Sequence, residues 1–238
     1  MKFGIKGFDR MSLLDWDGMV ATTLYLPGCN FRCPYCHNAG LVLAPEEYET
    51  IPLKDILSYI EEHNDFLDGA VITGGEPTIH PHLAELVESI RDAGLRVKLD
   101  TNGSAPDVVE YLIDSELIDY VAMDVKAPLD YEAYSRSAGI ADRDALERVR
   151  DTIDLLMEGR VEYEFRMTVV PALHRATDLE RVASQIEGAR RFVLQSYIAR
   201  DTLDPEFLNE APYNHERLEE FRDFMDGYVE DCILRGDE

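Results

Sequence analysis

The sequence predicts an α/β fold built on a parallel sheet, because six short apolar segments alternate with six amphipathic ones. Turn-forming or polar residues follow almost every apolar segment, as they do where strands end. No apolar run approaches the roughly 20 residues that span a bilayer. No internal repeat or linker divides the 238 residues, so we expect a single domain over 1–238, with 1–18 as an N-terminal extension.

The expected strands are short apolar segments rich in β-branched residues. They cover residues 19–26, 69–73, 95–100, 117–125, 162–170 and 191–197. The expected helices place apolar residues at helical spacing, as Leu53, Ile56 and Ile60 do. They cover residues 53–63, 80–93, 106–115, 142–158, 177–187 and 214–234. The first strand leads into a cysteine-rich loop, and the two together occupy residues 19–40.

The charge of the chain restricts its partners. It has 48 Asp and Glu residues against 23 Lys and Arg residues, a formal charge of −25. Non-specific binding to nucleic acid needs a basic surface, so we expect no nucleic-acid partner. The N-terminus lacks the pattern of a signal peptide, and we expect a cytoplasmic protein without a membrane partner. A cytosol of high salt would favour such an acidic surface, and an ordinary acidic protein is the equally good alternative.

The cysteines predict a metal cluster. Cys29, Cys33 and Cys36 follow the first strand with the spacing C-x3-C-x2-C, whereas Cys232 lies almost 200 residues away. A closed zinc site uses four ligands, and a second ligand pair is missing here. Three thiolates on an iron–sulfur cube leave one iron without a protein ligand, open to a substrate or cofactor. We expect Cys232 to be a buried bystander in the last helix.

The ends of the second and third expected strands carry further candidate ligands, because parallel sheets bind ligands at the carboxyl ends of their strands. Gly74 and Gly75 let the backbone approach a ligand, and Glu76 adds a carboxylate suited to an ammonium group. The alternative is a tight turn. Asp100 and Asn102 point to the same side of their strand and suit ribose hydroxyls, or they cap the turn that follows.

The fourth and fifth strands carry charges at or near their ends. Asp124 and Lys126 suit a carboxylate or hydroxyl group of a ligand, or they form a salt bridge at the rim of the sheet. Arg166 lies within an apolar strand and therefore needs an anionic partner. Glu164 lies two residues away on the same face and is the partner that the sequence favours.

Together these motifs resemble the radical S-adenosylmethionine (SAM) superfamily. The signature is the cysteine loop with an aromatic residue, Tyr35, before the last cysteine. Residues 12–38 are similar to the opening of anaerobic ribonucleoside-triphosphate reductase activating proteins, although Trp16-Asp17-Gly18 replaces an aromatic residue, proline and glycine. GGEPT (74–78), LDTNG (99–103) and MDVKAP (123–128) also resemble pyruvate formate-lyase activating enzyme. The resemblance implies an incomplete (β/α)6 barrel of parallel strands.

The resemblance also implies roles for the motif residues. Cys29, Cys33 and Cys36 would hold a [4Fe-4S] cluster whose fourth iron binds the amino and carboxylate groups of SAM. The other implied contacts are Tyr35 and His37 near the adenine, Gly74, Gly75 and Glu76 at the methionine amino group, Asp100 and Asn102 at the ribose, and Asp124 and Lys126 beside the SAM.

The implied activity is reductive cleavage of SAM, followed by formation of a glycyl radical on a partner anaerobic ribonucleoside-triphosphate reductase. A low-potential donor such as flavodoxin or ferredoxin would supply the electron. A radical SAM enzyme acting on a small molecule, such as a 7-carboxy-7-deazaguanine synthase, is one alternative. Others are an activase of a different glycyl radical enzyme and a non-enzymatic zinc or iron–sulfur module.

Overall fold

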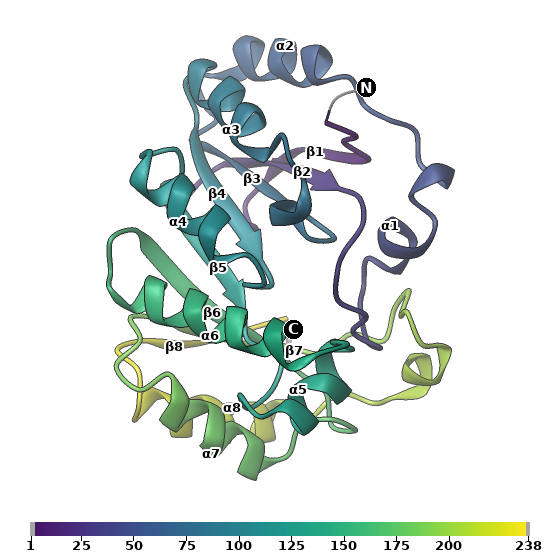
Figure 1. Cartoon of the computed structure of the whole chain (residues 1–238), viewed down its shortest axis with the longest axis vertical. Coiled ribbons are helices and arrows are strands. Elements are labelled where there is room, and N and C mark those ends of the chain that lie inside the picture. Colours follow the sequence, from purple (N-terminus) through teal and green to yellow (C-terminus); the bar gives the residue numbers. More distant parts are fainter. Residues whose placement is uncertain (1–2, 237–238) are drawn as a thin grey trace.

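The computed structural model describes residues 3–236, and it contains one sheet of eight strands in the order β1 to β8. β2 to β8 pair in parallel, and β1 pairs antiparallel with β2. The strands are β1 Gly7–Ser12, β2 Ala21–Leu26, β3 Gly69–Gly74, β4 Arg96–Thr101, β5 Tyr120–Asp124, β6 Glu162–Val169, β7 Phe192–Ser196 and β8 Cys232–Arg235. The sheet curves into an incomplete barrel (Figure 1), which confirms the predicted fold class.

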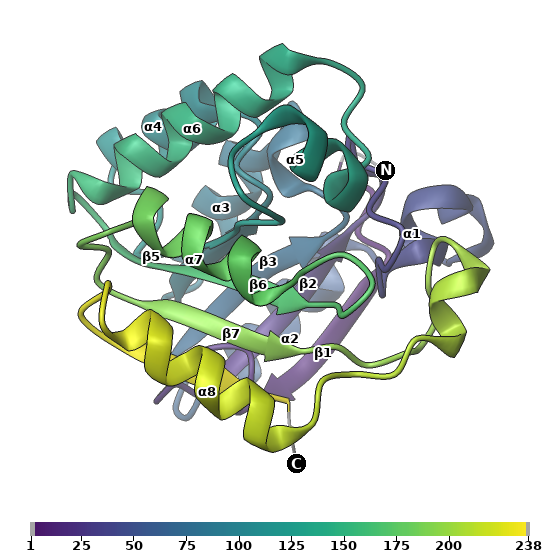
Figure 2. The same cartoon turned by 90° about the horizontal axis from the view of Figure 1, so that it is seen from below.

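Most of the helices lie along the outer side of the curved sheet (Figure 2). In chain order the helices are α1 Ala39–Leu43, α2 Leu53–His63, α3 Leu83–Asp92, α4 Pro106–Asp114, α5 Tyr131–Ala138, α6 Arg143–Met157, α7 Ala176–Gln185 and α8 His215–Asp226. Short 3-10 turns are η1 Pro45–Glu47, η2 Pro77–Ile79 and η3 Pro205–Asn209. α3 is an example of a helix that buries one apolar face, which is made of Leu83, Leu86, Val87 and Ile90. Each such side chain stabilises the fold by about 1.5–3 kcal/mol.

The two ends of the chain differ from the prediction. The segment 1–18, expected as an extension, contains β1, which pairs with β2. The helix expected over 214–234 ends at Asp226, and Cys232 begins β8 instead. Asp226 Oδ1 accepts a hydrogen bond from the backbone N–H of Cys232 at 3.1 Å, and β8 then pairs with β7. Pairing with a distant strand overrides the local helical pattern here. Cys232 is buried, as expected.

The loop between β1 and β2 covers the amino ends of the strands beside it. Trp16 is 4% exposed and packs against Ala21 and Val71. A side chain at Gly69 would lie 2.7 Å from the Trp16 ring, so only glycine fits there. Asp17 pairs with Arg235 of β8 at 2.6 Å. The residues that depart from the expected opening motif therefore join the start of the sheet to its last strand.

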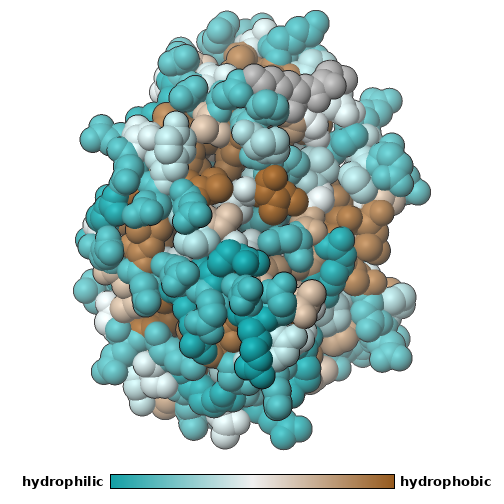
Figure 3. All heavy atoms as spheres, in the orientation of Figure 1, coloured by the Kyte–Doolittle hydropathy of each residue, from teal (hydrophilic) through white to brown (hydrophobic). Residues whose placement is uncertain are grey.

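Hydrophilic side chains cover most of the face shown in Figure 3, with apolar side chains gathered in separate patches. No helix within residues 3–236 is long and apolar enough to cross a membrane.

Candidate active site

A cavity of about 200 Å³ lies among the loops that follow the parallel strands. Among the predicted site residues, only Glu76 is missing from its wall. The predicted residues that line it are Cys29, Cys33, Tyr35, Cys36, His37, Gly74, Gly75, Asp100, Asn102, Asp124 and Lys126. The sequence did not assign the other lining residues, which are Phe31, Asn38, Val42, Thr73, Thr101, Arg166 and Thr168.

The three clustered cysteines lie on the loop between β2 and α1. Cys29 Sγ accepts hydrogen bonds from the Phe31 backbone N–H at 3.3 Å and from Asn102 Nδ2 at 3.7 Å. Cys33 is 8% exposed, and burial raises the pKa of its thiol to about 12. A buried thiol gives up its proton when a metal takes its place, so this environment suits ligation by iron.

The arrangement of the thiols also distinguishes between kinds of metal site. Within residues 3–236, no three His, Cys, Asp or Glu side chains converge on a point that would hold a single metal ion. A cube binds each thiolate through a different iron, so its ligands surround the cluster without converging. Three thiols on one loop therefore suit a cluster that takes each thiolate on a different iron.

Gly74, the last residue of β3, and Gly75 after it bring the backbone against the end of β2 and the start of the cysteine loop. Gly74 has φ +123°, and a Cβ there would lie 2.2 Å from Leu26 O. A Cβ at Gly75 would lie 1.8 Å from Gly28 O. Asn38 Nδ2 donates to Gly74 O at 2.6 Å and fixes the orientation of that carbonyl. Only glycine allows this approach, as the sequence indicated.

The structure corrects the role predicted for Glu76. Its side chain is 1% exposed and lies outside the cavity wall. The carboxylate accepts hydrogen bonds from Thr78 N and Oγ1, from Thr101 Oγ1 and from Asn102 N, at distances of 2.5–3.0 Å. Four donors within the protein surround this carboxylate. It joins η2 to the end of β4 and thereby positions Asn102, rather than facing an ammonium group of a ligand.

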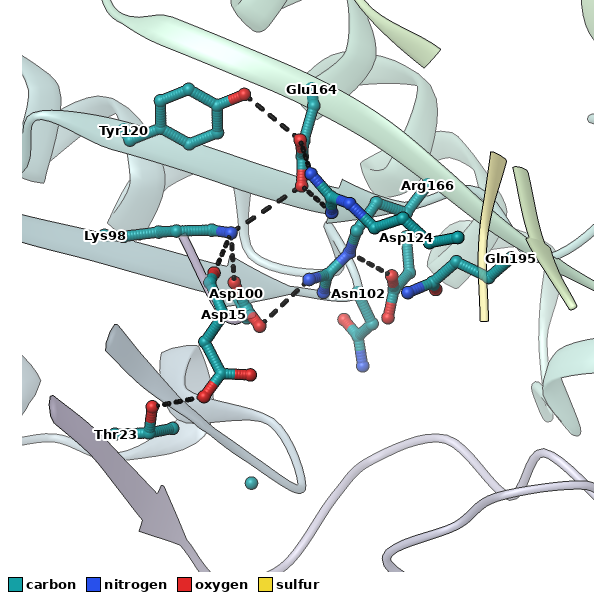
Figure 4. A network of polar contacts seen from close by, with 12 residues as sticks. Asp15, Thr23, Lys98, Asp100, Asn102, Tyr120, Asp124, Glu164, Arg166 and Gln195 are labelled. Atoms are coloured by element: carbon teal, nitrogen blue, oxygen red, sulfur yellow. Dashed lines mark hydrogen bonds and ion pairs between the residues drawn. The ribbon is translucent and has the colours of Figure 1, made fainter. Parts of the chain in front are cut away.

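A chain of ion pairs forms the charged wall of the cavity (Figure 4). Lys126 Nζ lies 2.8 Å from Asp124 Oδ2. Arg166 Nε lies 3.0 Å from Asp124 Oδ1, and Arg166 Nη1 lies 3.0 Å from Asp100 Oδ2. Burial alone would raise the pKa of Asp124, but Arg166 and Lys126 outweigh it and lower this pKa to about 2. Asp124 is therefore ionised at every physiological pH.

Glu164 is not the ion-pair partner of Arg166, contrary to the prediction. Its carboxylate lies 3.6 Å from Lys98 Nζ (Figure 4). It also lies 3.1 Å from Arg235 Nη1. Lys98 is 1% exposed, and its Nζ also lies 3.8 Å from Asp100 Oδ1. Arg166 donates to Asp100 Oδ2, whereas Asp100 Oδ1 is buried without a hydrogen-bond partner among residues 3–236, so one oxygen of this carboxylate can still accept from a ligand hydroxyl. The signal for this network was the placement of charged residues two apart within apolar strands.

The two rings of the cysteine loop, Tyr35 and His37, both line the cavity and pack on rings that do not. Tyr35 is 4% exposed, and its Oη is buried without a hydrogen-bond partner among residues 3–236. The edge of its ring packs on His174, with centroids 6.2 Å apart. The His37 ring lies 5.9 Å from that of Tyr197, and burial lowers the pKa of His37. Both rings stand where a flat group could pack beside the cysteine loop.

A comparison with known protein families shows which family this chain belongs to. The sequence model described as the radical SAM superfamily matches residues 23–183, more than half of the chain. The chain belongs to the radical SAM superfamily. It is a radical SAM enzyme, and the cofactors of this family are a [4Fe-4S] cluster and SAM. The cysteine loop, the two-glycine turn and the charged wall supply residues that fit both.

Three similar proteins show the range of this family. A protein of Methanocaldococcus jannaschii named a glycyl-radical enzyme activating enzyme is 31% identical over 99% of this chain and 97% of its own length. The 7-carboxy-7-deazaguanine synthase of Methanopyrus kandleri is 39% identical over 42% of this chain and 47% of its own length. The crystal structure of Streptococcus suis SuiB with SAM has a TM-score of 0.68 at 16% identity, covering 90% of this chain and 52% of that one. That last likeness supports the fold.

Proposed function

We propose that this enzyme activates an anaerobic ribonucleoside-triphosphate reductase by forming a glycyl radical on it. The observation that carries the proposal is the similarity along almost the whole chain to a protein named a glycyl-radical enzyme activating enzyme. The choice of reductase rests on residues 12–38, which resemble the opening of the reductase activating proteins. Flavodoxin or ferredoxin is the proposed electron donor, and the cytoplasm is the proposed location.

The site residues have separate tasks in this proposal. Cys29, Cys33 and Cys36 hold the cluster, and the backbone at Gly74 and Gly75 receives the methionine part of SAM. When bound there, the cluster and SAM supply a radical able to take hydrogen from a glycine Cα of the partner. The remaining lining residues orient SAM, and the wall keeps water away from it. A glycine is a suitable target because the radical left on its Cα is delocalised over two amides.

The first experiment asks whether SAM is cleaved. The protein is reconstituted with iron and sulfide without oxygen, reduced with dithionite and mixed with SAM, and 5′-deoxyadenosine is measured. We expect product from the wild type and none from Cys33→Ala. Protein that carries a full cluster and still yields no 5′-deoxyadenosine would contradict both the activase and the small-molecule function.

The second experiment asks which substrate is used. We add a candidate anaerobic ribonucleoside-triphosphate reductase to the same mixture and record the electron paramagnetic resonance spectrum. A doublet from a glycyl radical on the reductase is expected. SAM cleavage without a doublet would count against this partner.

A small-molecule substrate is the second candidate function. It is favoured by the partial match to a 7-carboxy-7-deazaguanine synthase, at 39% identity over 120 residues. Mass spectrometry for a carboxylated deazaguanine product separates the two functions. The activase proposal is favoured because its relative matches 99% of the chain, against 42% for the synthase.

A further inference from the structure

We propose that His174 is a positioning residue that holds Lys126 and Tyr35 in place at the wall of the cofactor cavity. His174 lies between β6 and α7 and is 0% exposed, so it does not itself reach the cavity. It touches two residues that do line the cavity, and these come from different loops. The proposal concerns the cofactor site and does not depend on the identity of the partner protein.

The hydrogen bonds of His174 fix its protonation state. The backbone N–H of Val170 donates to Nδ1 at 3.0 Å, so Nδ1 carries no proton. The proton of the neutral ring is therefore on Nε2, which lies 2.9 Å from the carbonyl oxygen of Lys126 and 3.2 Å from Ser137 Oγ. Burial lowers the pKa of His174 to about 4. The ring is therefore neutral at physiological pH, with one nitrogen accepting and the other donating.

The bond to Lys126 restrains the backbone just after β5. The Lys126 N–H lies 3.4 Å from Tyr134 Oη, which is a long hydrogen bond, so the shorter contact with His174 is the stronger restraint on this residue. The Lys126 side chain then reaches the cavity and pairs with Asp124. A shift of the Lys126 carbonyl would move the ammonium group along the charged wall.

The contact with Tyr35 restrains a second residue of the cavity wall, which comes from the cysteine loop. The two rings meet edge to face at 86°, a favourable arrangement for aromatic groups. Tyr35 Oη has no hydrogen bond within residues 3–236, so packing alone orients this ring. One histidine thus supports the cysteine loop through Tyr35 and the end of β5 through Lys126.

Two isosteric substitutions separate the two hydrogen bonds of His174. In His174→Asn, the amide oxygen takes the place of Nδ1 and keeps the bond from Val170, but nothing reaches Lys126. In His174→Gln, the amide nitrogen takes the place of Nε2 and keeps the bond to the Lys126 carbonyl. We measure the dissociation constant of SAM by equilibrium dialysis with oxidised, cluster-loaded protein, which binds SAM without cleaving it.

We expect His174→Asn to bind SAM about 3- to 10-fold more weakly, the effect of one lost hydrogen bond on a neighbouring contact. His174→Gln keeps the bond to Lys126 but loses the ring that packs on Tyr35, so its affinity should lie between those of His174→Asn and the wild type. The control is His63→Asn, since His63 lies on α2 and bonds to Tyr59 O. It should leave the SAM affinity unchanged.

Either of two results would overturn the proposal. One is wild-type SAM affinity in His174→Asn, and the other is equal weakening in both variants, which a purely structural role would produce. A measurement on the wild type does not depend on how well the variants fold. The ¹⁵N spectrum of the cluster-free protein should show a neutral His174 ring protonated on Nε2, and protonation on Nδ1 would also overturn the proposal.

Discussion

At the scale of single residues, the four cysteines differ in what surrounds them. Cys33 lines the cavity with two other thiols, whereas Cys232 is buried among apolar side chains on β8. We expect Cys33→Ala to lose most of the bound iron, because it removes one of three ligands. Cys232→Ala should keep the iron and cost about 1 kcal/mol of stability through lost packing. Analysis of iron and sulfide after reconstitution checks both, and loss of iron in Cys232→Ala would contradict this assignment.

Arg166 carries a second prediction, because it is the cation shared by two partly buried carboxylates. Arg166→Gln leaves Asp100 and Asp124 facing each other, and we expect a loss of about 3 kcal/mol in the free energy of unfolding at pH 7. Arg181→Gln is the matched control, since its ion pair with Asp130 is exposed and its loss should cost under about 1 kcal/mol. Urea unfolding measures both, and equal losses would contradict the assigned role.

The pKa of Asp124 gives this prediction a dependence on pH. The folded value, about 2, lies below the ordinary value of 3.8, so the carboxylate stabilises the fold above pH 3.8. That contribution disappears as the pH falls towards 2. In Arg166→Gln the pKa of Asp124 in the folded state should rise. The difference between wild type and variant in the free energy of unfolding should therefore become smaller as the pH falls.

Single residues also show which parts of the site could be predicted from the sequence. The rule that ligands gather at strand ends located the cysteines, Gly74, Asp124 and Lys126, and the structure brings them together around one cavity. The sequence could not show which way Glu76 points, because its direction depends on donors from β4. The partners of Arg166 were equally hidden, since they come from β4 and β5 and depend on the register of the sheet.

At the scale of elements, the prediction followed hydrophobicity and failed where hydrophobicity is weak. All six predicted strands exist as β2 to β7, each with a buried apolar pattern. β1 is half-buried or exposed throughout, and β8 has only four residues. Both form at the edges of the sheet because a partner strand is available, which no local pattern reveals.

The start of α6 provides a test of one element. Asp142 Oδ1 accepts a hydrogen bond from the Ala145 N–H at 2.8 Å and caps the helix. Asp142→Ala should cost about 1 kcal/mol, which lowers the midpoint of thermal unfolding by about 2–4 °C. The control is Asp144→Ala, in the first turn without this cap, and it should cost about half as much. Equal midpoints for the two variants would contradict the capping role.

At the scale of the whole molecule, the charge of −25 resides mainly in carboxylates that face solvent. Salt screens such charges, and the Debye length falls from about 10 Å at 0.1 M to about 3 Å at 1 M. We therefore expect potassium chloride to raise the midpoint of thermal unfolding over this range, since it weakens repulsion in the folded state. An uncharged osmolyte at the same osmolality is the control. A midpoint that falls or stays constant would argue against adaptation to high salt.

The order of the sheet, in which each strand pairs with the next one along the chain, has a consequence for how the protein is made. On the ribosome, each strand therefore emerges after the neighbour with which it pairs. Cys29, Cys33 and Cys36 emerge well before Asp124 and Arg166, which complete the wall opposite them. A growing chain thus exposes these thiols before the residues of the cavity wall on β5 and β6 have been synthesised. We therefore expect the cluster to be inserted after translation has passed β6.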